Sequence, residues 1–447
     1  MKIPEKPPSW MKSFQKMPPQ SFELFATEKG RSLLRKIDDE YLHWEKIKYK
    51  SVSGVIEPHH LWAFVKASRM QKRRVLPMLS TTKKAFTYGL PDSVQRELHL
   101  VDRFAGGQIG LETPGLSPDA RDRFLVSSLM EEAIASSQIE GAATTRLIAK
   151  EMLRSGRKPR NRAERMILNN YRTIQRIKSF VERDLSIDLL HELQESMAEG
   201  TLDDPECLGR FRLKSEDIHV VDVEDGKSLH IPPPSRELEK RMEAMCDFAN
   251  RDEAAAFIHP VVKAIVLHFW LAYNHPYVDG NGRTARALFY WYAMKKGYWL
   301  MEFLSISRII MKSRNQYYRS FLYAESDDFD VTYFIVYHLK ALNLALEELR
   351  RYLDRKQREY RESVTILRGW SGLNYRQQAL LRHALNNPFA IYTFKSHMNS
   401  HNVAYATARS DLLDLADRGL LVENKVGRQF QFLVHGDLSE KITKGEL

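Results

Sequence analysis

The sequence predicts a mainly α-helical protein with a few short β-hairpins. Over most of its 447 residues, apolar side chains recur at the spacings of three and four that place them on one face of a helix. Residues 218–231 and 425–432 instead show short apolar or alternating runs around a turn, as hairpins do. Glycine and proline gather at residues 106–118, and glycine again at 369–372. We therefore predict three regions, residues 1–114, 115–368 and 369–447.

The composition fits a folded protein and excludes few partners. Hydrophobic residues make up 43% and charged residues 28%, which is an ordinary globular mixture. The net charge of +11 permits an acidic or nucleic-acid partner without requiring one. Cys207 and Cys246 are the only cysteines, so no disulfide framework is expected. Neither a signal peptide nor a membrane-spanning run is evident, so we expect a cytoplasmic protein with no membrane partner.

The first region has a helical texture. Residues 1–30 are rich in proline and lysine, and we expect an extended arm there. Apolar residues at helical spacings predict a helix within residues 31–72, and a second one from about His60 to Arg69 after the break at Gly54 and Pro58. We interpret this region as a packing layer; a regulatory or partner-binding cap is the alternative.

The chemistry concentrates in residues 275–286, which read HPYVDGNGRTAR. Gly280 and Gly282 lack a Cβ, so the backbone there allows a close approach of a ligand. A helical run follows the loop, and the free N–H groups at a helix start form an anion site. Arg283 and Arg286 lie three residues apart on one helix face, where their planar groups would grip phosphate oxygens. The stretch predicts a site for a phosphate-bearing ligand.

Two further side chains suit the same ligand. Asp279 is the one carboxylate of the loop, and a Mg²⁺ ion that bridges phosphates needs only one or two carboxylates plus water. His275 stands at the mouth of the loop, where an imidazole accepts a proton near neutral pH.

This stretch resembles the signature of the Fic family, His-Pro-Phe-x-(Asp/Glu)-Gly-Asn-Gly-Arg-x-x-Arg. The one departure is Tyr277 in place of Phe; the family's aromatic residue points into the core, so the hydroxyl should need a hydrogen-bond partner. The resemblance covers roughly residues 115–350. It implies a Fic-type helical core with a small β-hairpin flap, acting as a protein adenylyltransferase that moves AMP from ATP to a Tyr, Thr or Ser hydroxyl of a target protein.

The resemblance also implies roles for individual residues. His275 would take the proton from the target hydroxyl, and Asp279 would hold Mg²⁺ across the α- and β-phosphates. Asn281 and the loop N–H groups would hold α-phosphate oxygens, while the two arginines would grip the β- and γ-phosphates. In the Fic family, one of two adjacent aromatic residues lies beside the adenine, and Tyr318 is the candidate for this contact here. The ATP-binding residues expected in this way are Gly280, Asn281, Gly282, Arg283, Arg286 and Tyr318. Glu325 departs from an Asn that touches the nucleotide in some relatives.

A second stretch is similar to the inhibitory motif of the Fic family, (Ser/Thr)-x-x-x-Glu-(Gly/Asn). It comprises Ser136, Glu140 and Gly141 at the end of a helix predicted to begin near Pro118. The resemblance implies that Glu140 pairs with Arg286 and blocks placement of the γ-phosphate, because a carboxylate can occupy the fork that a phosphate needs.

Residues 218–231 are the predicted flap. Ile218, His219, Val220 and Val221 form an apolar run before an Asp-Gly turn, and a proline triplet at residues 232–234 ends the returning run. In the Fic family this hairpin docks an extended target segment by strand addition. A plain surface hairpin is the alternative.

The last region resembles a winged helix-turn-helix. Two short helices are predicted at residues 394–400 and 404–417, followed by a hairpin at residues 425–432. In that fold Thr407 and Arg409 would lie on the recognition helix and Arg428 in the wing, where they would contact DNA. Docking or dimerisation through the same fold is an equal alternative, and a homodimer is left open.

Single residues distinguish AMP transfer from alternative activities. Gly282 stands where the kinase-like Doc relatives carry Lys, which favours AMP transfer. Removal of AMP by the same enzyme stays open, since the inhibitory Glu of some relatives positions a water for it. A DNA-binding regulator that only senses nucleotide would not need His275.

Overall fold

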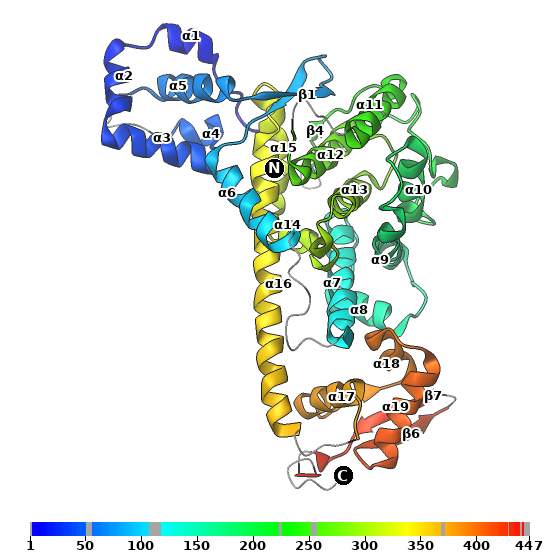
Figure 1. Ribbon diagram of the computed structural model, residues 1–447. Helices are drawn as coiled ribbons and strands as arrows, with labels where there is room; N and C mark the ends of the chain where they lie inside the picture. The colour runs from blue at the N-terminus through cyan, green and yellow to red at the C-terminus, as the bar shows by residue number, and fades with distance from the viewer. Residues whose placement is uncertain are drawn as a thin grey trace.

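The computed structural model describes residues 2–50, 56–106, 118–222, 226–251, 257–367, 372–427, 429–438 and 440–441. The mainly helical fold class is confirmed: nineteen α-helices stand beside seven short strands in this part of the chain. Among the described residues, buried apolar side chains gather in one large central core and in three smaller clusters, one near each end of the chain and one within residues 130–167. The molecule is elongated, with the long helix α16 (Thr332–Leu367) along one side (Figure 1).

The N-terminal helices have a core of their own. They are α1 (Trp10–Gln15), α2 (Pro19–Ala26), α3 (Glu28–Glu40), α4 (Trp44–Ile47) and α5 (Pro58–Gln71). The extended arm predicted for residues 1–30 is wrong. Pro19 occupies the first position of α2, where its fixed φ suits a helix and its missing N–H costs nothing. Met17 and Phe25 are buried against α5, so tertiary packing holds these short helices.

A hairpin that the sequence did not predict follows α5. Strand β1 (Arg74–Leu79) pairs antiparallel with β2 (Ala85–Tyr88), and the helix α6 (Asp92–Val101) comes next. Pro77 inside β1 argues against a strand, because proline donates no ladder hydrogen bond. The strand forms at an edge, where Leu76 and Met78 are buried in the central core.

The central helices surround α12 (Pro260–Asn274) and α13 (Asn281–Lys295), whose facing sides are almost wholly buried. Around them lie the helices α7 (Pro118–Ile139), α8 (Arg146–Ser155), α9 (Arg162–Phe180), α10 (Ile187–Ala198), α11 (Leu238–Asn250), α14 (Ile306–Lys312), α15 (Arg314–Ser326) and α16. The hairpin of β3 (Val220–Val221) and β4 (Ser228–His230) lies beside α12 and α15. The predicted start of α7 at Pro118 is confirmed.

The C-terminal unit has a core of its own. Its elements run α17 (Tyr375–Asn386), β5 (Ile391–Tyr392), α18 (Phe394–His401), α19 (Tyr405–Asp417), β6 (Leu421–Val426) and β7 (Gln429–Val434), with sheet order β5-β7-β6. Asp411 of α19 is buried and accepts hydrogen bonds from Asn374, Arg376 and His397, which joins the three helices. Helix α18 also touches α8, where Lys395 Nζ donates to Gly156 O at 3.5 Å.

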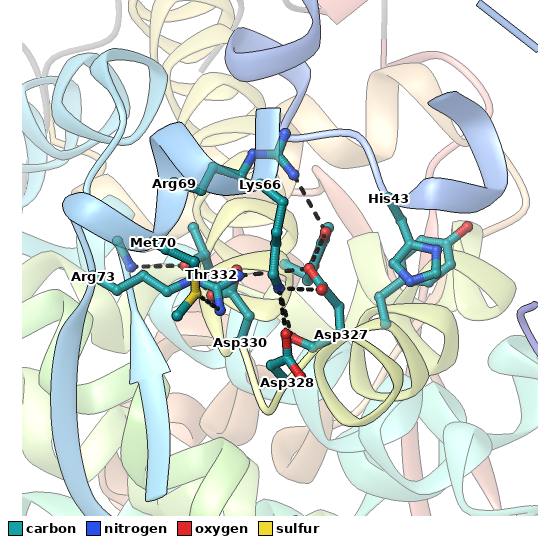
Figure 2. Close-up of polar contacts among 12 residues, drawn as sticks. His43, Lys66, Arg69, Met70, Arg73, Asp327, Asp328, Asp330 and Thr332 are labelled. Atoms are coloured by element: carbon teal, nitrogen blue, oxygen red, sulfur yellow. Dashed lines mark hydrogen bonds and ion pairs between the residues drawn. The ribbon is translucent and has the colours of Figure 1, made fainter. Parts of the chain in front are cut away.

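A buried polar network joins the N-terminal helices to the central ones (Figure 2). Lys66 of α5 is fully buried and pairs with Asp327 and, at 3.2 Å, with Asp328 in the loop between α15 and α16. Arg73 pairs with Asp330, which also accepts from Tyr41 Oη at 2.7 Å. Because buried charges cost much free energy unless they are paired, this network fixes the N-terminal helices against one end of α15.

Candidate active site

The site is built on the turn between α12 and α13. His275 ends α12 in the left-handed conformation, with φ 46°, and its N–H bonds back to Leu271 O at 2.9 Å. Gly280 precedes α13 with φ 87°, a conformation that L side chains rarely adopt. No side chain caps α13. Its first N–H groups have no partner within the helix, so they are available to an anion.

The shape of the loop depends on Asn281 and Tyr277. The Asn281 side chain donates to Tyr277 O at 2.7 Å and accepts from Tyr277 N at 2.9 Å, so it closes the turn on itself. Tyr277 is fully buried, and its hydroxyl lies 3.2 Å from His191 Nδ1. The hydrogen-bond partner expected for this hydroxyl is therefore present. A contact between Asn281 and phosphate oxygens stays a prediction, because both ends of its amide already bond to the loop.

Asp279 and Arg283 form the acidic and basic edge of the loop. Asp279 Oδ1 accepts from Gly280 N at 2.6 Å, while Oδ2 lies 3.3 Å from Arg283 Nη2 and 3.6 Å from Arg162 Nη2. A third of the Asp279 side chain is exposed. Arg283 is fully buried and donates to Met197 O at 2.7 Å, and its Nε has no hydrogen-bond partner. An orphaned donor beside an accessible carboxylate fits a ligand with anionic oxygens and a metal ion.

The imidazole and the backbone of His275 are both held by neighbouring groups. Its Nδ1 lies 3.4 Å from Ala272 O, and Arg212 Nε donates to the His275 carbonyl oxygen at 2.9 Å. Burial lowers the pKa of His275 to about 4, with the nearby His230 as the next contribution. The ring is consequently neutral at physiological pH, the form in which a histidine accepts a proton.

Glu140 and Ser136 of the α7 end hold Arg286. Arg286 Nη1 lies 2.9 Å from Glu140 Oε1, Arg286 Nε donates to Ser136 Oγ at 2.8 Å, and Nη2 donates to Ser136 O at 2.8 Å. The structure therefore brings together the loop and the short motif, although 146 residues separate Glu140 from Arg286. Gly141 follows in the left-handed conformation, with φ 90°.

The same carboxylate lies against the start of α13. A Cβ built on Gly282 would stand 2.1 Å from Glu140 Oε1 and 2.7 Å from its carboxyl carbon. Such contact is possible only because residue 282 is a glycine. Glu140 thus places a negative charge at a helix N-terminus, where the helix dipole and free N–H groups favour an anion.

Helix α15 supports the end of α7 from another side. Arg314 Nη2 donates to Ile139 O at 2.8 Å, and the Tyr318 hydroxyl lies 3.5 Å from the same oxygen. Tyr317 is buried and bonds to His268 Nε2 at 2.9 Å, so this tyrosine is the core member of the pair and Tyr318 is the half-buried one. Arg314 was not predicted as a site residue, since its partner is a backbone oxygen that no motif reveals.

The predicted flap is present as a short hairpin. Val220 and Val221 form β3 and pair with His230 and Ser228, whereas Ile218 and His219 precede the strand. Asp225 of the predicted turn lies outside the described residues. His219 is exposed and lies 3.3 Å from Asp217. His230, by contrast, contacts Glu325 and Tyr273. These contacts could not be predicted from the sequence, because the partners come from two other helices.

The C-terminal site residues lie apart from this loop. Thr407 and Arg409 are on the first turns of α19, with Arg409 exposed. Arg428 lies outside the described residues.

The middle of the chain matches a known protein family. Residues 184–293 match the model of the Fic/DOC family. The matched segment contains α10, the flap, α11, α12, the loop and most of α13. The Fic match does not reach α7, so Glu140 and Ser136 lie outside it.

Curated relatives match a short part of the chain. A protein adenylyltransferase Fic of Nematostella vectensis is 38% identical over 90 residues, which is 20% of this chain and 19% of that protein. The protein adenylyltransferase Fic of Drosophila willistoni is 39% identical over 69 residues, 15% of this chain and 14% of that protein. The chain therefore matches less than a fifth of the length of these curated relatives. Together with the Fic/DOC match, they support membership of the Fic family.

Solved structures are similar as well. A Fic family protein from Desulfovibrio desulfuricans is 20% identical, with a TM-score of 0.49, over 76% of this chain and 95% of that one. A fragment of Fic-1 from C. elegans is 19% identical, with a TM-score of 0.46, over 78% of this chain and 92% of that one.

Among the described residues, we find no helix with the length and apolar character needed to cross a membrane.

Proposed function

We propose that this protein is a protein adenylyltransferase that moves AMP from ATP to a side-chain hydroxyl of another protein. The observation that carries the proposal is the loop itself: a neutral histidine, an uncapped helix start and the Arg286 fork converge within residues 275–286. The Fic/DOC match and the adenylyltransferase relatives support the same reaction.

The chain's own groups divide the work. His275 accepts the proton of the target hydroxyl, which then attacks the α-phosphate while pyrophosphate leaves. The first N–H groups of α13 hold phosphate oxygens, and Arg283 and Arg286 face the remaining negative charge. Tyr318 contacts the base in this proposal.

Asp279 is the residue that would hold Mg²⁺. The described residues contain no cluster of three or more His, Cys, Asp or Glu side chains able to hold a metal, so an ion here would take Asp279 together with oxygens of the bound nucleotide and water. When bound, the ion neutralises charge on the phosphates.

Glu140 is a brake on this reaction. It forms an ion pair with the Arg286 guanidinium and lies at the helix start that a phosphate would need. Resting protein therefore binds ATP weakly or unproductively. Removal of AMP from a modified target, with Glu140 placing a water, remains a second outcome of the assay.

The test is transfer from α-labelled ATP with Mg²⁺ into proteins of a cell lysate and into the chain itself. The brake-free variant Glu140→Gly should label proteins, whereas the same variant carrying His275→Ala should label none while still binding ATP in calorimetry. Equal labelling with and without His275 would overturn the role of this residue.

DNA binding is the second candidate, for the C-terminal unit. Arg409 is exposed near the start of α19, and the unit has the helices and hairpin that the sequence predicts. Retardation of DNA by the full chain should weaken steeply with salt, because phosphate neutralisation releases counterions. If no DNA is retarded at low salt, the unit docks a protein instead.

A further inference from the structure

His230 has no part in the reaction as described, yet it joins the flap to the central helices. It is the last residue of β4, and only 9% of its side chain is exposed. Its Nδ1 lies 2.9 Å from Glu325 Oε2 on α15, and its Nε2 lies 2.7 Å from the backbone oxygen of Tyr273 on α12. Tyr273 is two residues from His275, so this contact is made in the last turn before the loop.

The chemistry of the two partners fixes the protonation of the ring. A backbone carbonyl oxygen only accepts a hydrogen bond, and so does an ionised carboxylate. A neutral imidazole carries one N–H and one acceptor nitrogen. Both contacts of His230 are therefore hydrogen bonds at the same time only when each ring nitrogen carries a proton.

We propose that His230 is a positioning residue of the active site: as an imidazolium it fastens the flap between Glu325 and the end of α12, where its positive charge adds to burial in favouring the neutral form of His275. The reaction that this arrangement serves is the one proposed above, so that part of the inference rests on the proposed function.

The surroundings of His230 agree with this assignment. The groups that face it are Glu325 from α15, Tyr273 and His275 from α12 and its end, and Arg212 from the segment before the flap. Burial lowers the pKa of His230, but the hydrogen bond and the charge of Glu325 outweigh burial and raise it above the ordinary value. In turn, the His230 charge is the largest contribution after burial to the lowered pKa of His275. Two neighbouring histidines are thus driven in opposite directions.

The sign of the pH dependence follows. Because the pKa of His230 is raised in the folded state, the fastening is fully present below the ordinary histidine value of about 6.5. It is lost as the pH rises through the raised value. Alkaline conditions should therefore release the flap, while His275 stays neutral.

The experiment is a pH titration of the histidine ring signals by NMR on ¹³C-labelled protein without ATP or target. Signals are assigned by their loss in His275→Ala and His230→Gln. In the wild type, His275 should titrate well below the ordinary range and His230 above it. In His230→Gln, the titration of His275 should move up toward about 6.5. Glu325→Gln keeps an acceptor for the flap but removes the charge, so the titration of His230 should move down.

A matched control lies on the same hairpin. His219 is a flap histidine that pairs with a carboxylate, Asp217, but its side chain is 37% exposed. His219→Gln should leave the titration of His275 in place. An unchanged His275 titration in His230→Gln, or a wild-type His230 that is neutral at pH 7, would overturn the proposal. If His230→Gln does not fold, the Glu325→Gln titration decides.

Transfer rates distinguish an effect of the His230 charge on His275 from a purely structural role of His230. In the Glu140→Gly background, His230→Gln should lower the transfer rate at pH 6 and change it little at pH 8. The loss at pH 6 should reach at most about fourfold, which is the drop in the neutral fraction of His275 if its pKa returned to the ordinary value. A loss that is equal at both pH values contradicts the electrostatic role. Because the NMR titration needs no transfer, a protein without transferase activity would overturn the proposed function and leave the titration result standing.

Discussion

Glu140 and Gly282 touch so closely that a methyl group on Gly282 would stand 2.1 Å from the Glu140 carboxylate. These residues come from the end of α7 and the start of α13, and the same carboxylate is paired with Arg286. One anion thus takes both features that a nucleotide phosphate would use, the helix start and the arginine fork. The two occupants would exclude each other, so the brake proposed for Glu140 would compete with ATP.

Glu140→Gly should raise self-modification strongly. A charge-assisted pair of this kind contributes about 1.5–3 kcal/mol, so its loss would raise productive ATP occupancy by roughly 10- to 150-fold. The measurement is incorporation of α-labelled AMP. Arg286→Ala should remove both the brake and the activity.

Glu131→Gln is the matched control for this change. Glu131 lies on the same helix but pairs with Arg146 and Lys150, away from the loop. Its incorporation should equal that of the wild type. If Glu140→Gly incorporates AMP no faster than the wild type, Glu140 is not an effective brake. If the variant loses the ability to remove AMP from a modified target, Glu140 also serves the reverse reaction.

Gly282→Ala tests the contact between the two residues directly. The new methyl group must displace the Glu140 carboxylate, and overpacking of this kind costs about 1–3 kcal/mol. We expect a lower free energy of unfolding for Gly282→Ala in the wild type and a much smaller loss in the Glu140→Gly background. Denaturant unfolding of the four proteins gives the coupling. Equal losses in both backgrounds would mean that Glu140 does not rest on Gly282 in solution.

Asp279→Asn should abolish the Mg²⁺ dependence of ATP binding. The substitution keeps the size of the side chain and an acceptor for Gly280 N, but removes the carboxylate. Calorimetry with Mg²⁺ and with EDTA, in the Glu140→Gly background, measures the difference. Asp203→Asn is the control, since Asp203 is almost fully exposed and, like Asp279, is paired with Arg162. Binding that still strengthens with Mg²⁺ in Asp279→Asn would assign the ion to other ligands.

Local patterns in the sequence identified the loop of the candidate site but not the residues that support it. Residues 275–286 are contiguous, so the loop, the helix start and the arginines could be named from the sequence. The pairing of His230 with Glu325 joins residues 95 positions apart and depends on how the flap meets α15. Arg314 bonds to a backbone oxygen, which leaves no trace in side-chain types.

The fold, too, could be predicted from the sequence only in part. Helix α12 could be predicted because its sequence is apolar almost throughout, and a helix of this kind is buried on all sides. The short helices α1 and α2 and the strand with Pro77 form because burial against α5 and the central core outweighs weak local preference. Propensity alone could not show this.

Lys66→Met should loosen the joint between the N-terminal helices and the central ones. Lys66 and Asp327 are both almost fully buried, so removing the cation leaves the Asp327 carboxylate with a longer pair to Arg73, at 3.6 Å, and a hydrogen bond from Tyr333, in a region of low dielectric. The expected loss in the free energy of unfolding is about 3–5 kcal/mol at pH 7. Lys312→Met is the control, because Lys312 pairs with Glu348 at 2.9 Å but is 62% exposed. Its loss should be about 0–1 kcal/mol.

Lys66→Met should also unfold at a less acidic pH than the wild type, because it starts from a lower free energy of unfolding. Burial raises the pKa of Asp330, but Arg73 and Lys66 outweigh it and hold the pKa below the ordinary carboxylate value. A lowered carboxylate pKa adds stability above the unfolded value, and this stability is lost as the pH falls through the native value. Without Lys66 the native pKa of Asp330 moves up, so the acid unfolding midpoint of Lys66→Met should shift to higher pH than in the wild type. Circular dichroism during acid titration of both proteins measures the shift. Coincident midpoints would mean that Lys66 does not act on Asp330, and that the network holds the joint through packing.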